Sequence, residues 1–177
     1  MLPLKRMNHL QKIQNKILDP NQLVKKTAEL KSAEKKIVFT NGCFDILHKG
    51  HVQYLSIAAD KGDVLIVAIN SDASVKRQNK GDNRPINPFD ARATLLAALS
   101  FVDFVVEFDE ETPQKLIELV HPNVLVKGAD YDPNDTDRTS KKYIVGREIV
   151  LAHGGKVEVI DLVQGYSTTA IINKSKQ

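Results

Sequence analysis

The chain has 177 residues, of which 42% are hydrophobic and 27% are charged, and its formal net charge at pH 7 is +3. This composition is typical of one globular domain with its own core, and it excludes disordered and fibrous classes. A charge this small does not indicate nucleic-acid binding. No apolar run is long enough to span a membrane, and the first residues lack the apolar core of a signal peptide, so we expect a cytoplasmic protein without a membrane partner.

Two helices, 5–18 and 20–33, are predicted first, separated by Asp19 and Pro20. An aspartate followed by proline is typical of an N-cap and the first helical position. Each helix has one apolar stripe, which needs a partner surface, either the following domain or a second copy of the chain. We therefore divide the chain into an N-terminal helical extension, 1–35, and a domain over 36–177.

The stretch from Thr40 to His51 follows a short apolar run and leads into a helical pattern, so it predicts a strand, a tight turn and a helix. Gly42 and Gly50 would let the backbone approach a ligand closely. The helix that begins near Gly50 points free N–H groups towards the turn, which predicts a site for an anion.

His48 and His51 lie three residues apart at the start of this helix, so both imidazoles could face one bound group. Imidazoles can donate hydrogen bonds to phosphate oxygens and favour a transition state with additional negative charge. The alternative is that both are surface or capping histidines and that the glycines only turn the chain. The single cysteine, Cys43, allows no internal disulfide, which fits a reducing compartment, and we treat it as a small turn residue.

Apolar segments alternate with helical patterns along the rest of the chain, including a helix predicted over 143–153. This alternation predicts an α/β fold, specifically a Rossmann-like three-layer α/β/α sandwich with a five-stranded, mainly parallel sheet, plus the N-terminal helices. The predicted strands are 37–39, 63–69, 102–107, 124–126 and 156–160.

Ligands of such folds lie at the carboxyl ends of the strands, where Asp72 and Gly128 are expected. The basic loop that contains Lys80 and Arg84 is either a solvated loop or a clamp for phosphates. The polar segment 132–142 is predicted to be a lid or an acceptor loop.

Two features complete the predicted site. Arg92 lies near the start of a helix, where one interpretation is a structural ion pair. Ser167, Thr168 and Thr169 stand at the N-terminus of the last helix, where hydroxyls and free N–H groups can bind phosphate oxygens. Alone, this cluster is also a common capping pattern.

The motif Gly42-x-Phe44-Asp45-x-x-His48-x-Gly50-His51 resembles the signature of the cytidylyltransferase-like nucleotidyltransferases. The longer string from Thr40 to His48 looks closest to the D-glycero-β-D-manno-heptose 1-phosphate adenylyltransferases. The similarity extends from about Lys36 to about Asn173, and the serine and threonine cluster resembles the second signature of the family.

The resemblance implies an enzyme that joins AMP from ATP to the sugar 1-phosphate by in-line displacement, with Mg²⁺ as the counter-ion of the phosphates and no protein metal site. It also implies a homo-oligomer, as is common among related enzymes. The implied catalytic residues are His48, His51 and Lys80; the nucleotide-binding residues are Thr40, Asn41, Gly42, Phe44, Arg92, Gly128, Ser167, Thr168 and Thr169; and the acceptor-binding residues are Asp45, Asp72 and Arg84.

Two alternatives stay open. Glycerol-3-phosphate cytidylyltransferases, which use CTP, usually carry Arg-Thr where this chain has Leu162 and Val163, and an arginine where it has Ser100; the absence of these basic residues favours ATP. The second alternative is a non-catalytic nucleotide-binding module on the same fold, against which the retention of both histidines argues.

Overall fold

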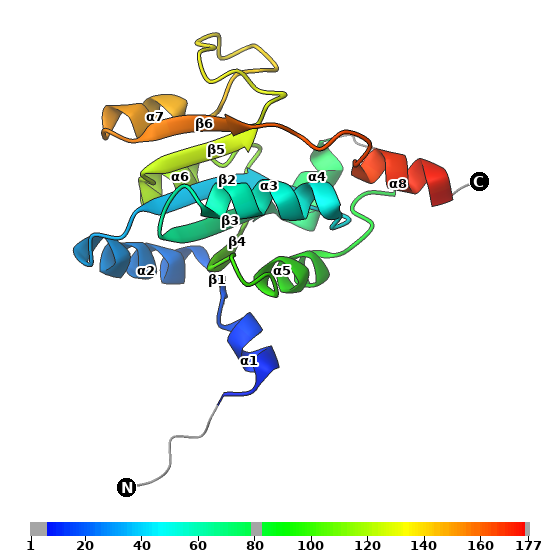
Figure 1. Cartoon of the computed structure of the whole chain (residues 1–177), viewed down its shortest axis with the longest axis horizontal. Coiled ribbons are helices and arrows are strands. Elements are labelled where there is room, and N and C mark those ends of the chain that lie inside the picture. The colour runs from blue at the N-terminus through cyan, green and yellow to red at the C-terminus, as the bar shows by residue number, and fades with distance from the viewer. Residues whose placement is uncertain (1–6, 79–82, 176–177) are drawn as a thin grey trace, which may run out of the picture.

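The fold is built around one twisted parallel sheet, shown in Figure 1. The computed structural model describes residues 7–78 and 83–175. Within these residues the sheet has six strands in the order β1-β4-β3-β2-β5-β6. The strands are β1 Ile17–Leu18, β2 Ile37–Gly42, β3 Val64–Asn70, β4 Phe104–Phe108, β5 Val124–Gly128 and β6 Lys156–Ile160.

The prediction of five strands was wrong by one, because part of the first predicted helix is an edge strand. The helix α1 covers only His9–Gln14, and Ile17 and Leu18 form β1, which pairs with β4. The ammonium group of Lys16 donates hydrogen bonds to two backbone carbonyls, of Leu99 and Val102, 3.1 and 2.7 Å away. Pairing with a distant strand therefore overrides the local helical pattern. Sequence periodicity carries no information about such pairing.

The remaining helices follow the predicted order. As predicted, Asp19 caps α2, since its side chain accepts a hydrogen bond from the backbone N–H of Gln22. The helix predicted over 143–153 is shorter, because Gly146 has a φ of +87°, a left-handed conformation that starts the helix at Arg147. The helices are α2 Pro20–Ser32, α3 Lys49–Ala59, α4 Asp72–Arg77, α5 Phe89–Ala97, α6 Gln114–Val120, α7 Arg147–Ala152 and α8 Thr168–Ser175.

Helices cover both faces of the sheet and make the predicted three layers. On one face α3 and α5 pack on alternate strand residues such as Val67. On the other face α2, α6 and α7 pack on the residues between them, such as Ile66. Burial on both faces explains why β3 is continuously apolar.

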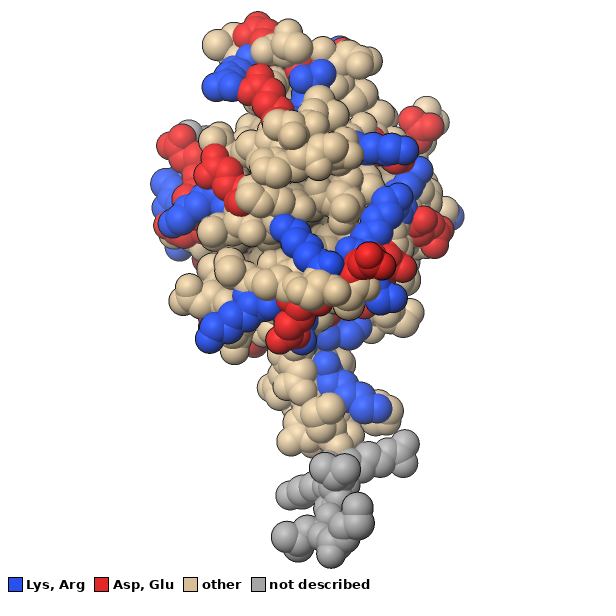
Figure 2. Space-filling view, turned by 90° about the vertical axis from the view of Figure 1, so that its left-hand side faces the viewer, with Lys and Arg blue, Asp and Glu red and all other residues tan. Residues whose placement is uncertain are grey.

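The N-terminal helices pack mainly on this domain. Leu23 of α2 is fully buried in the core on the face of the sheet covered by α2, α6 and α7. Ile13 of α1 packs against the core on the opposite face, under α3 and α5. Leu10, on the same stripe as Ile13, stays 56% exposed. Figures 1 and 2 show α1 projecting from the body of the molecule.

The sheet has a topological switch point between β2 and β5. From β2 the chain moves outward to β3 and β4, and then returns to place β5 on the other side of β2. At their carboxyl ends these two strands are bridged by Tyr54 of α3, whose hydroxyl lies 2.7 Å from the Thr40 hydroxyl and donates to the Val126 carbonyl. In open α/β sheets such a switch point opens a crevice for ligands.

Charges of both signs are interspersed over the face in Figure 2, which shows the end of the molecule formed by α2 and α7 in Figure 1. That face has no continuous basic surface of the kind that nucleic-acid binding requires. None of the helices in the described part of the chain combines the length and apolarity needed to cross a lipid bilayer.

A pair of leucine substitutions tests whether α2 belongs to the core. Leu23→Ala should lower the free energy of unfolding by about 2–5 kcal/mol, because it leaves a cavity in a buried cluster. The same change at the exposed Leu10 should cost less than about 0.5 kcal/mol. Denaturant unfolding of both variants measures the difference, and equal, small effects would contradict this packing.

Candidate active site

A pocket of about 590 Å³ lies at the carboxyl edge of the sheet, over the switch point. Its lining includes the ends of β2, β3 and β5, the start of α3, and the segment before α8. Both anion sites expected from the sequence therefore open into one cavity. The predicted residues on the lining are Asn41, Gly42, Phe44, His48, His51, Gly128, Ser167 and Thr168.

The two histidines are stacked at the start of α3. Their ring centroids are 3.7 Å apart and the rings are inclined by 16°. His48 is the N-cap of α3, because its Nδ1 atom accepts a hydrogen bond from the backbone N–H of His51 at 3.3 Å. In a neutral His48 the proton must then be on Nε2, which remains as a donor for a bound group.

Both imidazoles are neutral in the free protein near pH 7. Burial lowers the pKa of His51 to about 4, reinforced by the adjacent His48 and partly opposed by the backbone of Ile46. Burial also lowers the pKa of His48. Neutral rings can donate hydrogen bonds to phosphate oxygens but add no fixed positive charge to the pocket.

The N-terminus of α8 reaches the same cavity through Ser167 and Thr168. The Ser167 hydroxyl caps this helix by accepting from the backbone N–H of Ala170 at 3.1 Å. Tyr166 joins this segment to α3: its ring lies 6.5 Å from the ring of His48, and the Lys49 ammonium is 5.4 Å from its centroid. A Cβ atom at position 50 would lie 3.1 Å from the His48 ring and 3.3 Å from the Cβ atom of Tyr166, so glycine eases this close approach.

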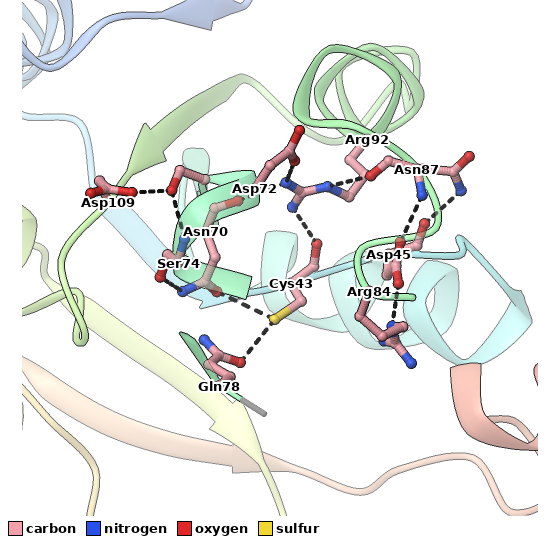
Figure 3. Close-up of polar contacts among 11 residues, drawn as sticks. Cys43, Asp45, Asn70, Asp72, Ser74, Gln78, Arg84, Asn87, Arg92 and Asp109 are labelled. Atoms are coloured by element: carbon pink, nitrogen blue, oxygen red, sulfur yellow. Dashed lines mark hydrogen bonds and ion pairs between the residues drawn. The ribbon is translucent and has the colours of Figure 1, made fainter. Parts of the chain in front are cut away.

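Arg92 lies outside the lining and is buried within the protein, and Figure 3 shows its polar contacts. Its guanidinium donates to the backbone carbonyls of Asn87, Cys43 and Asn70 at 2.8–3.0 Å and to the carboxylate of Asp72 at 2.7 Å. The structure therefore favours the ion-pair interpretation of this arginine over a nucleotide-phosphate contact.

The predicted acceptor residues also lie off the lining. Asp45 is buried, forms an ion pair with Arg84 and accepts from the backbone N–H of Asn87 at 2.9 Å (Figure 3). Asp72 is engaged by Arg92. The charges of these three side chains are engaged in ion pairs within the protein, although the Asp72 side chain remains 40% exposed.

Three predicted residues remain. Thr40 is buried beside Tyr54, and Thr169 is not on the lining. Lys80 lies outside the described residues.

Lining residues that the sequence analysis did not select include Lys127, Tyr131, Tyr166 and Lys141. Lys127 is the last side chain before Gly128 at the end of β5 and is 8% exposed. A single charge at the carboxyl end of an apolar strand is a usable sequence signal, since lysine is almost never buried without a partner. Lys141 and Tyr166 carry no such signal, because loops bring them to the pocket.

The described residues contain no group of three or more His, Cys, Asp or Glu side chains placed to hold a metal ion. Glu111 and Asp130 are the carboxylates on the described lining. This arrangement does not fit an all-protein metal cage, whereas Mg²⁺ carried mainly by phosphates needs few protein ligands.

Comparison with known proteins places the pocket in a family context. The cytidylyltransferase-like family matches residues 39–174. The chain is 51% identical over 161 residues to the bifunctional protein HldE of Proteus mirabilis (strain HI4320), covering 91% of this chain and 32% of that protein. It is 55% identical over 147 residues to the bifunctional protein HldE of Campylobacter jejuni subsp. jejuni serotype O:6, covering 83% and 29%.

A solved structure shares the fold. The lipopolysaccharide core biosynthesis protein from Thermoplasma volcanium GSS1 has a TM-score of 0.56 and 27% sequence identity, covering 75% of this chain and 99% of that one. The two HldE relatives are longer, and the chain spans about a third of their length.

The structural role of Arg92 predicts a loss of stability on replacement. Arg92→Lys keeps the charge but removes the planar fork, so buried carbonyls lose partners and the free energy of unfolding should fall by about 2 kcal/mol or more. Arg77→Lys is the matched control, because Arg77 and Asp109 form an exposed ion pair. Thermal unfolding compares them, and equal melting temperatures would contradict the structural role.

The lowered pKa of His51 predicts a pH dependence of stability. As pH falls from about 6.5, the ordinary imidazole pKa, the unfolded chain gains a proton at His51, whereas the folded protein resists it until about pH 4. Stability should therefore fall with pH across this window. His51→Gln should reduce the slope of the unfolding free energy against pH by the equivalent of up to about one bound proton. Parallel slopes for the unaltered protein and this variant would exclude the effect.

Proposed function

The chain belongs to the cytidylyltransferase-like family, and from this premise we propose that it is the adenylyltransferase that joins AMP from ATP to D-glycero-β-D-manno-heptose 1-phosphate. The products are ADP-heptose and pyrophosphate. One observation carries the proposal: the stacked histidines of α3 and the hydroxyl-rich start of α8 open into a single pocket at the switch point of the sheet.

The proposed reaction is a direct displacement at phosphorus. A phosphate oxygen of the acceptor attacks the α-phosphorus of ATP, the bond from that phosphorus to the bridging oxygen breaks, and pyrophosphate leaves with the electron pair. A sugar phosphate is already ionised near neutral pH, so the reaction needs no strong general base. Positioning and stabilisation of the developing charge supply the acceleration.

The residues of the pocket divide this work. Neutral His48 and His51 donate hydrogen bonds to the phosphate oxygens that gain charge in the transition state. The N-terminus of α8, with Ser167 and Thr168, binds the β- and γ-phosphates. Mg²⁺ bound to the triphosphate would neutralise part of its charge.

The choice of ATP and of a heptose acceptor draws on four supports. The string from Thr40 to His48 resembles the heptose 1-phosphate enzymes, and HldE proteins are about 50% identical to this chain. One solved relative is a lipopolysaccharide core biosynthesis protein. In the pocket, Leu162 and Val163 present apolar side chains where glycerol-3-phosphate cytidylyltransferases usually carry Arg-Thr.

Pyrophosphate release tests the proposal directly. ATP and CTP are each combined with heptose 1-phosphate and with glycerol 3-phosphate, and the ATP and heptose combination should be the fastest. CTP with the polyol phosphate would identify the alternative cytidylyltransferase. Nucleotide binding without pyrophosphate release from any combination would identify a non-catalytic module.

Replacement of His51 tests its assigned role. His51→Ala should lower turnover by a factor of about 10²–10³, because a donor to the developing charge is lost in a desolvated site. The control is His153→Ala, which alters an exposed histidine outside the lining. Turnover by His51→Ala within a few fold of the unaltered protein, with normal unfolding behaviour, would refute the assignment.

A further inference from the structure

We propose that Lys127 binds the phosphate group of the acceptor, in the half of the pocket opposite the nucleotide's phosphates. The inference rests on the proposed function, since it assumes that a phosphorylated acceptor enters this cavity. It goes further by assigning a specific side chain and a side of the sheet to that acceptor.

The first argument is the position of Lys127 at the switch point. The register pairs Val38 with Val124 and Phe39 with Leu125, so two residues further along Asn41 of β2 comes beside Lys127 of β5. The ammonium of Lys127 donates to the side-chain oxygen of Asn41 at 3.0 Å and thus spans the crevice between these strands. Both residues line the pocket.

The second argument is the face of the sheet to which Lys127 belongs. Leu125, two residues earlier, packs in the core cluster on the side of α6 and α7, and strand side chains alternate, so Lys127 points to that side. The stacked histidines come from α3, which covers the opposite face. The pocket therefore has two halves, with the imidazoles on one side of the strand ends and Lys127 on the other.

The surroundings of Lys127 suit a phosphorylated sugar. A turn in which the Tyr131 N–H donates to the Gly128 carbonyl places the Tyr131 ring over Lys127, with the ammonium 4.6 Å from the ring centroid. Burial raises the pKa of the Tyr131 hydroxyl, so the group stays protonated and can donate to a sugar oxygen. Tyr143 and Lys141 line the same cavity from the following loop.

The charge balance of the pocket supplies the third argument. The imidazoles are neutral, and Arg84 and Arg92 are engaged with Asp45 and Asp72 off the lining. On the described part of the lining the lysines are Lys127 and Lys141 and the carboxylates are Glu111 and Asp130. Of these four side chains Lys127 is the buried one, and the other three are exposed. A dianionic phosphate must approach an anionic triphosphate, and a buried ammonium offsets that repulsion more strongly than an exposed one.

The hydrogen bond to Asn41 holds the ammonium at a fixed place on the β2 side of the crevice, next to Gly42. Lys127 thus acts as a binding and specificity residue for the acceptor, and nucleotide binding should depend on it little.

Calorimetric titration tests this assignment. The nucleotide is α,β-methylene ATP, in which a methylene group replaces the oxygen between the α- and β-phosphorus atoms, so the protein can hold both ligands without reaction. Lys127→Met should weaken binding of heptose 1-phosphate to the nucleotide-loaded protein by at least about tenfold, the loss expected for a charge-assisted contact. Binding of the ATP analogue should change by less than about twofold, which also reports an intact fold. Lys127→Gln is a second variant, and Lys156→Met, at an exposed position of β6, is the control.

The outcomes separate this inference from the proposed function. Glycerol 3-phosphate is titrated in parallel: if the unaltered protein binds it instead of the heptose, and Lys127→Met weakens that binding, the acceptor was misidentified and the lysine assignment stands. Equal binding by the unaltered protein and both Lys127 variants would overturn the assignment. So would weaker binding of the ATP analogue alone, or failure of the unaltered protein to bind either phosphate.

Discussion

The guanidinium of Arg92 lies behind the carboxyl edge of the sheet, where it donates to three backbone carbonyls and to Asp72. Those carbonyls belong to the turn after β2, the end of β3 and the segment before α5. One buried cation thus fixes three chain segments that meet beside the pocket. The placement of the stacked histidines depends on it, because the turn through Cys43 leads directly into α3.

The proposed chemistry relies on neutral donors. Burial that lowers the pKa of His51 to about 4 removes positive charge from the place where phosphates would bind. Helix N-termini and hydroxyls bind anions through aligned dipoles, and such groups need little reorganisation as charge develops. Positive charge then has to come from elsewhere, which gives the buried Lys127 its importance in the proposed division of the pocket between nucleotide and acceptor.

The site could be predicted in part. Local motifs identified the histidines and the Ser167 cap, and both open into one pocket as expected. Motifs could not separate residues that line the cavity from those that build its wall: Asp45 and Arg92 have the charges of ligands, but their partners are within the protein. That distinction depends on which distant carbonyls and carboxylates are within reach, and sequence spacing carries no such information.

The alternating α/β pattern, the N-cap of α2 and the strand-turn-helix motif around the histidines could all be derived from the sequence, because each depends on residues that are close together along the chain. The sixth strand, Ile17 and Leu18, became evident only in the folded protein, since its partners Val105 and Val106 lie far along the chain. The tertiary structure also decided that Lys127 meets Asn41 across the switch point. Both outcomes follow from the strand order, and pairing between distant strands is set by the packing of the whole sheet.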